Sequence, residues 1–113
     1  MMMTSLSDQP LSEQFRIVAR NWVDAEAAAC LMEETKSAVF AEMVARALGE
    51  DISLAHNRAE TLVKSSPSWK EYVTEMVRLR RDANLAKVKL EYVKMKASEQ
   101  MSAEATHRAE ARL

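Results

Sequence analysis

The residues best suited to chemistry form a basic segment, "RLRRDANLAKVKLEYVKMK", from Arg78 to Lys96. Seven cations stand there against two acids, so the local charge is about +5. On a helix the cations would form two lines, because residues seven apart share one side. Ordered cations of this kind can bind phosphate groups or an acidic partner. The candidate nucleic-acid or partner-binding residues are Arg78, Arg80, Arg81, Lys87, Lys89, Lys94 and Lys96.

A second interpretation assigns these cations to the fold itself. The whole chain has a formal charge of −1, so acidic residues elsewhere offset the basic segment. An acidic first helix lying antiparallel to a basic third helix would pair with it, and both interpretations stay open. The acidic side chains of the first helix could alternatively occupy a cationic nucleic-acid channel of another protein. These residues are Asp24, Glu26, Glu33, Glu34 and Glu42.

The sequence carries no pattern of a catalytic site. Adjacent acids such as Glu33 and Glu34 diverge by about 100° on a helix, so they cannot jointly flank a substrate. His56 and Glu60 are four residues apart and could share one helix face, but a stable metal site needs further ligands. With Gly49 as the sole glycine, no phosphate-cradling loop can form. We therefore expect a non-enzymatic protein without metal or cofactor.

Composition also limits where in the cell the protein can be located. No run of about 18 apolar residues is present, and the start "MMMTSLSDQPLSEQ" lacks the pattern of a signal peptide. Cys30 is the sole cysteine, which excludes an internal disulfide. We expect no membrane association and a location in the cytoplasm of the cell that makes the protein.

Helical periodicity runs through almost the whole chain and predicts an all-α fold. Two long helices are expected, at about 10–48 and 67–112, joined by a short helix at about 53–64. Residues 1–9 would be a flexible lead, and 10–113 a single helical domain. We expect a helical hairpin or coiled-coil-like bundle, in which Trp22, Trp69 and Tyr72 pack the core.

Local signals support these boundaries. Pro10 can open the first helix, Gly49 is expected to end it in the left-handed region, and Pro67 can open the third. The expected helix caps are Ser7 or Asp8, then Asp51 or Ser53, then Ser66.

The third helix carries a heptad seam of apolar side chains. Its members are Tyr72, Met76, Leu79, Ala83, Ala86, Leu90, Val93 and Ala97. Beyond Ala97 the step becomes four, so the last turns should leave the first partner helix or meet a different one. Further apolar residues flank the seam, so the apolar surface of this helix is wider than one partner helix can cover. We therefore expect a homodimer in which the seam contributes to the interface.

The segment from Ser66 to Leu113 resembles the C-terminal half of small helical proteins of tailed bacteriophages and prophages. Its most distinctive strings are "ANLAKVKLEY" and "EATHRAEARL", and "LSEQFRIVARNWVDAEAAACLMEE" is similar to the first half of those proteins. Such proteins are often encoded near recombination or single-strand annealing genes. The resemblance implies an accessory of phage DNA recombination or replication that contacts DNA, a phage recombination protein or another DNA-bound partner. It brings no catalytic residue.

A different class of function also fits a small protein without catalytic residues. Such a protein could inhibit a host nuclease or defence complex, as anti-CRISPR or anti-exonuclease proteins do, by covering its surface. The acidic residues of the first helix would then carry the function.

Overall fold

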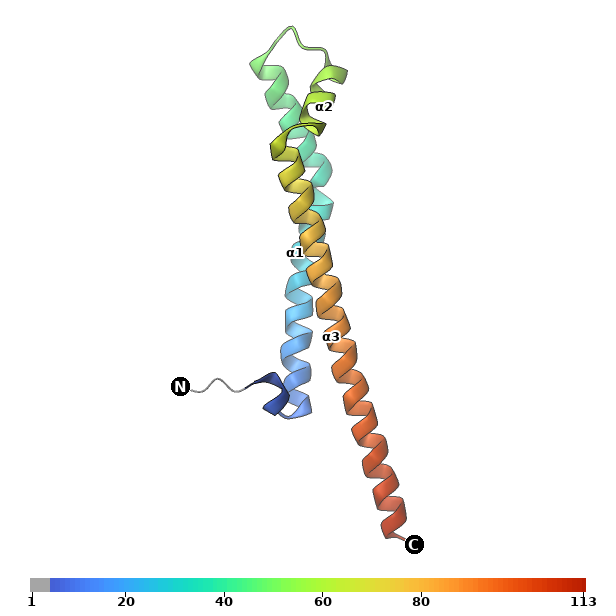
Figure 1. Cartoon of the computed structure of the whole chain (residues 1–113). Coiled ribbons are helices and arrows are strands. Elements are labelled where there is room, and N and C mark those ends of the chain that lie inside the picture. The colour runs from blue at the N-terminus through green and yellow to red at the C-terminus, as the bar shows by residue number, and fades with distance from the viewer. Residues whose placement is uncertain (1–4) are drawn as a thin grey trace, which may run out of the picture. The chain divides into compact units, whose positions relative to one another are not determined.

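The structure is a computed structural model that describes residues 5–113, and its described part contains helices and no strand. A short 3-10 turn, η1 (Leu6–Asp8), precedes the long helix α1 (Leu11–Glu50). A short helix, α2 (His56–Lys64), joins it to the long helix α3 (Pro67–Ala111) (Figure 1). The prediction of an all-α fold with two long helices joined by a short one is confirmed.

Two of the predicted helix starts are found where expected. The Pro10 carbonyl accepts the N–H groups of Glu13 and Gln14 at 3.0 and 2.9 Å, so this proline stands directly before α1. The Ser66 hydroxyl accepts the N–H of Trp69 at 3.3 Å, which is the bond of an N-cap. Sequence signals at these two starts therefore act through local hydrogen bonds.

Three other predicted signals are wrong. Gly49 lies inside α1 and has no positive φ, because the helix continues to Glu50 before the chain turns. Asp51 does not cap α2, because its carboxylate instead accepts the N–H and the hydroxyl of Ser53, at 3.1 and 2.6 Å. Ser53 does not cap α2 either, because the residue directly before this helix is Ala55, which makes no side-chain cap.

The expected caps of α1 lie in the turn that precedes it. Ser7 and Asp8 belong to η1, where the Ser7 hydroxyl lies 2.7 Å from that of Ser5. The buried Gln14 side chain donates a 2.7 Å bond to the Gln9 carbonyl, which ties this turn to α1. Residues 1–4 of the predicted flexible lead lie outside the described residues.

The chain forms two compact units, which we describe separately. The first unit comprises residues 1–25 and 83–113, of which residues 5–25 and 83–113 are described. The second unit comprises residues 26–82. The predicted single domain at 10–113 stays a prediction.

In the first unit, the start of α1 packs against the middle of α3. Val18, Leu90 and Val93 are buried together, and Ala19 and Trp22 pack against them. Every residue from Ser98 to Leu113 is exposed. The end of α3 thus extends past its packing partner in this unit, as the change of spacing after Ala97 predicts.

In the second unit, the end of α1 packs against α2 and the start of α3. Val44, Ala59 and Val63 are buried, with Phe40 and Trp69 against them. Phe40 meets Trp69 edge to face at 5.0 Å between ring centroids. Such aromatic pairs add to the stability that burial alone provides.

Tyr72 extends this aromatic cluster and bonds to α1. Its ring stacks on that of Trp69 at 5.6 Å, with an interplanar angle of 7°. Its hydroxyl donates a 2.6 Å bond to the Met32 carbonyl and lies 3.1 Å from the Thr35 hydroxyl. This fixes the register of α3 against α1 in the second unit. The prediction that Trp22, Trp69 and Tyr72 pack the core is confirmed for all three.

The heptad seam faces the interior of the chain. Ala83, Leu90 and Val93 are buried, and Leu90 and Val93 contact α1. The other seam residues are half-buried: Tyr72, Met76, Leu79, Ala86 and Ala97. Packing within one chain therefore already uses much of this surface. The large apolar residues left exposed on α3 are Val77, Leu85, Val88, Tyr92 and Met95, which flank the seam, and Met101, which lies beyond it.

Among the described residues, no helix combines the length and the apolar character needed to cross a bilayer.

Candidate nucleic-acid interface

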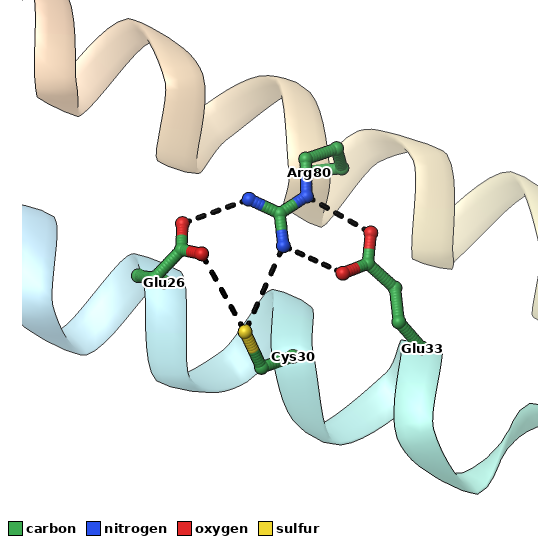
Figure 2. A network of polar contacts seen from close by, with 4 residues as sticks. All are labelled: Glu26, Cys30, Glu33 and Arg80. Atoms are coloured by element: carbon green, nitrogen blue, oxygen red, sulfur yellow. Dashed lines mark hydrogen bonds and ion pairs between the residues drawn. The ribbon is translucent and has the colours of Figure 1, made fainter.

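Arg80 is bound to the acidic side of α1 within the second unit (Figure 2). Its guanidinium donates to both carboxylate oxygens of Glu33, at 2.9 and 2.5 Å, and to Glu26 at 2.8 Å. It also lies 3.8 Å from the Cys30 sulfur, which in turn contacts Glu26 at 3.5 Å. Arg80 is therefore the residue for which the predicted interhelical pairing is confirmed.

These bonds change the acid–base properties of the three groups. Hydrogen bonds from Arg80 hold the pKa of Glu33 and that of Glu26 below their ordinary values. The same bonds, donated to Glu33 and Glu26, raise the pKa of Arg80. All three groups stay charged at neutral pH, and Arg80 is already matched by two carboxylates.

Arg78 is neutralised within α3 itself. It forms ion pairs with Glu75 and, at 3.0 Å, with Asp82. The hydrogen bond from Arg78 lowers the pKa of Glu75, and that of Arg78 is raised in return. These pairs follow from the i, i+3 and i, i+4 spacings on one helix face.

The remaining five cations of the basic segment have no acidic partner among residues 5–113. Arg81, Lys87, Lys89 and Lys94 are exposed, and Lys96 is half-buried. The four lysines belong to the first unit, where Glu91 is the one acid between residues 83 and 97. The structure thus divides the candidate residues into two bound arginines and a group of unpaired cations.

The four lysines form two pairs on opposite sides of α3. Two residues turn an α-helix by about 200°, so Lys87 and Lys89 point in nearly opposite directions. Lys94 repeats the position of Lys87, and Lys96 repeats that of Lys89. A ligand lying along one side of α3 would meet one pair and not the other.

Lys89 and Lys96 line a cavity in the first unit. Its volume is about 470 Å³, and η1, α1 and α3 all contribute to its wall. Lys96 lies over the ring of Tyr92, 5.6 Å from the centroid, and Tyr92 also lines the cavity. Ser5 and Ser7 add two hydroxyl groups. The sequence does not predict that these serines line a cavity with the lysines, because nothing in it indicates that the turn before α1 lies beside α3.

A second basic cavity, of about 340 Å³, lies in the second unit. Lys36 and Lys64 line it together with Phe40 and Trp69. The Lys64 ammonium lies 5.9 Å from the centroid of the Phe40 ring. The sequence analysis missed this site as well, although Lys36 interrupts the apolar periodicity of α1 and could have drawn attention to it.

The acidic residues of α1 are only partly available to a partner. Glu26 and Glu33 bind Arg80, and Glu42 lies 3.7 Å from Arg46 on its own helix. Asp24 and Glu34 are exposed. The candidate inhibitory face is therefore interrupted by bonds within the second unit.

His56 and Glu60 contact each other as their spacing suggests, with 2.9 Å between Nε2 and Oε1. The described residues bring together no group of three His, Cys, Asp or Glu side chains able to hold a metal.

No protein-family model, curated protein or solved structure matches the chain. The resemblance to phage proteins stays a prediction from the residues quoted above, and the function has to be argued from the surface of the molecule.

Proposed function

We propose that the protein is a non-enzymatic binding protein that contacts DNA, or a DNA-bound partner, through the four lysines of α3 from Lys87 to Lys96. One observation carries this proposal: Arg78 and Arg80 are paired with acids, whereas Lys87, Lys89, Lys94 and Lys96 have no acidic partner among the described residues. Unpaired surface cations concentrated on one segment are suited to an anionic polymer.

The physical basis is the release of counterions. A lysine that replaces a condensed cation on a nucleic-acid backbone returns that ion to the solution, which favours binding at low salt. A lysine already paired with a carboxylate would first have to give up that pair. The first unit therefore attracts nucleic acid more strongly than the formal charge of −1 for the whole chain suggests.

The biological part of the proposal follows the resemblance. The protein would act beside phage recombination or replication proteins, in the cytoplasm of a bacterial host. It would act as a homodimer, because Leu85, Val88 and Met95 leave an apolar stripe of α3 exposed in one chain.

The test is DNA binding measured by fluorescence anisotropy, with labelled single-stranded and double-stranded oligonucleotides at several salt concentrations. The wild-type chain should bind at low salt and lose affinity steeply as salt rises. A variant with Lys87, Lys89, Lys94 and Lys96 all changed to Gln should lose most of this binding. Absence of wild-type binding at low salt would refute the proposal.

A matched control removes the same number of charges elsewhere. Lys36, Arg58, Lys64 and Lys70 are exposed residues of the second unit. Changing these four to Gln should leave most of the binding intact. If both fourfold variants lose affinity equally, the binding depends on net charge alone and not on the four lysines from Lys87 to Lys96.

Inhibition of a host nuclease or defence complex is the weaker candidate, because Arg80 occupies two of the five acidic side chains that it would use. A pull-down from nuclease-treated host lysate separates the two functions. A stoichiometric host protein that is retained by the wild type and lost after Asp24→Asn and Glu34→Gln would favour inhibition. Recovery of partners only in the presence of DNA would favour the proposed function.

A further inference from the structure

We infer that the cavity beside Lys89 and Lys96 is the subsite that holds a phosphate of single-stranded nucleic acid. This inference rests on the proposed function and narrows it to one side of α3. The cavity lies within the first unit and has a volume of about 470 Å³. Its wall contains two lysines, and no acidic residue contributes to it.

The polar groups around the cavity are suited to an anion with several oxygens. Lys89 and Lys96 supply ammonium groups from α3, Ser7 supplies a hydroxyl group from η1, and Ser5 supplies one from the residue before η1. The two hydroxyl oxygens lie only 2.7 Å apart, so they are presented to the same small region. A phosphodiester has two non-bridging oxygens that can accept bonds from ammonium and hydroxyl donors together.

The position of Lys96 is partly set before any ligand binds. Its ammonium lies over the Tyr92 ring, at 5.6 Å from the centroid, and the side chain is half-buried. An ammonium held in this way loses less conformational freedom on binding than a fully mobile lysine. The buried Gln14 supports the opposite wall, because its bond to the Gln9 carbonyl ties η1 to α1.

The apolar part of the wall favours a single strand over a duplex. Leu6 and Tyr92 line the cavity beside the cations and are 39% and 55% exposed. Unpaired bases can turn away from their own strand and pack against such surfaces, whereas bases in a duplex remain stacked inside it. A phosphate beside apolar side chains thus matches a flexible single strand.

The other lysine pair provides a control on the same helix. Lys87 and Lys94 have the same spacing as Lys89 and Lys96, yet they point to the opposite side of α3 and do not line the cavity. A strand seated on the cavity should not need them. Exchanging either pair for Gln removes the same charge from the same unit.

The experiment compares Lys89→Gln/Lys96→Gln with Lys87→Gln/Lys94→Gln in the full chain, using single-stranded DNA and its duplex in the anisotropy assay. For the first variant we expect single-strand affinity to fall about tenfold at low salt, as for two exposed charge contacts. The slope of log K against log salt should become shallower by about 0.7, since the two lysines hold one phosphate and each phosphate contact on a single strand contributes about 0.7. The second variant should bind nearly as the wild type does.

The serines give a second, independent readout. Ser5→Ala/Ser7→Ala removes two neutral donors, so it should weaken single-strand binding while leaving the salt slope unchanged. Circular dichroism should show wild-type helicity for every variant, since the altered side chains lie at the surface or on the cavity wall.

The outcomes separate the subsite from the proposed function. If the wild type binds DNA and the Lys87/Lys94 variant is weakened as much as or more than the Lys89/Lys96 variant, the subsite is refuted and the proposed function stands. Equal affinity of the wild type for single strands and duplex would also refute the subsite. If the wild type binds no DNA but binds phosphatidylglycerol vesicles through Lys89 and Lys96, both are refuted and the anion site belongs to a lipid surface.

Discussion

Arg80 and Glu33 lie 47 residues apart in the chain and form a two-pronged ion pair, with nitrogen–oxygen distances of 2.9 and 2.5 Å. Glu26 binds the same guanidinium from the other side. We expect Arg80→Gln to lower the melting temperature more than Arg16→Gln does, because Arg16 pairs only with Glu13 on its own helix. Arg80→Lys should recover only part of the loss, since an ammonium cannot bond in two-pronged fashion.

A double-mutant cycle checks this pair directly. Arg80→Gln combined with Glu33→Gln should destabilise the protein by less than the sum of the two single changes. Thermal unfolding followed by circular dichroism provides the values. Simple additivity would show that the ion pair does not stabilise the fold.

The same cluster predicts a pH dependence. The pKa values of Glu26 and Glu33 lie below the ordinary value of 4.5, because Arg80 bonds to their charged forms. Groups with a lowered pKa in the folded state add stability that is fully present above the ordinary value and is lost as the pH falls through the folded-state value. Between about pH 5 and pH 3, the melting temperature of the wild type should fall more than that of Arg80→Gln. Parallel pH profiles for the two proteins would contradict this assignment.

Tyr72 should stabilise the fold through its hydroxyl as well as through its ring. Tyr72→Phe keeps the stacking on Trp69 but removes the bond to the Met32 carbonyl, and should lower the free energy of unfolding by about 1 kcal/mol. Tyr92→Phe is the matched control, because Tyr92 is 55% exposed and its hydroxyl makes no bond with the described residues. Urea unfolding monitored by tryptophan fluorescence would measure the free energy of unfolding of both variants. An equal decrease in the two would argue against a stabilising bond from the Tyr72 hydroxyl.

Leu90 and Lys89 are neighbours in the chain with opposite environments. Leu90 is 6% exposed and packs with Val18 and Val93, whereas Lys89 is exposed. Leu90→Asp would place an unpaired charge in the core of the first unit, which costs several kcal/mol, so we expect a large loss of helicity by circular dichroism. Lys89→Asp should keep the helicity. Comparable helicity in the two variants would show that this core contributes little.

The exposed apolar stripe of α3 predicts a homodimer. Light scattering of the wild type should give twice the chain mass of 12.8 kDa. Val88 and Met95 are 63% and 51% exposed, so changing both to Gln should reduce the mass to that of one chain while preserving helicity. A wild-type mass equal to one chain would refute the dimer, and a variant that stays dimeric would place the interface elsewhere.

The sequence by itself was sufficient to determine the helices and many of their limits. Apolar side chains at steps of three and four define α1 and α3, because only a helix places such residues on one face. Ser66 before Pro67 marks the start of α3, because its hydroxyl bond to Trp69 is local. Gly49 and Asp51 misled the analysis, because a glycine can remain helical and an aspartate can bond within its own loop.

Only the tertiary structure decided which cations of the basic segment pair with acids and which remain unpaired. Arg80, Lys87 and Lys94 share a seven-residue spacing, but the sequence of α3 does not show which of them meets an acid on α1. That depends on the register between the helices, which in the second unit is fixed by side chains such as Tyr72 on the Met32 carbonyl. The cavity at Lys89 and Lys96 likewise requires η1, whose position results from packing and from the bond between Gln14 and Gln9. Contacts between residues distant in the chain leave no periodic signal, and for that reason the structure was needed to separate the bound arginines from the unpaired lysines.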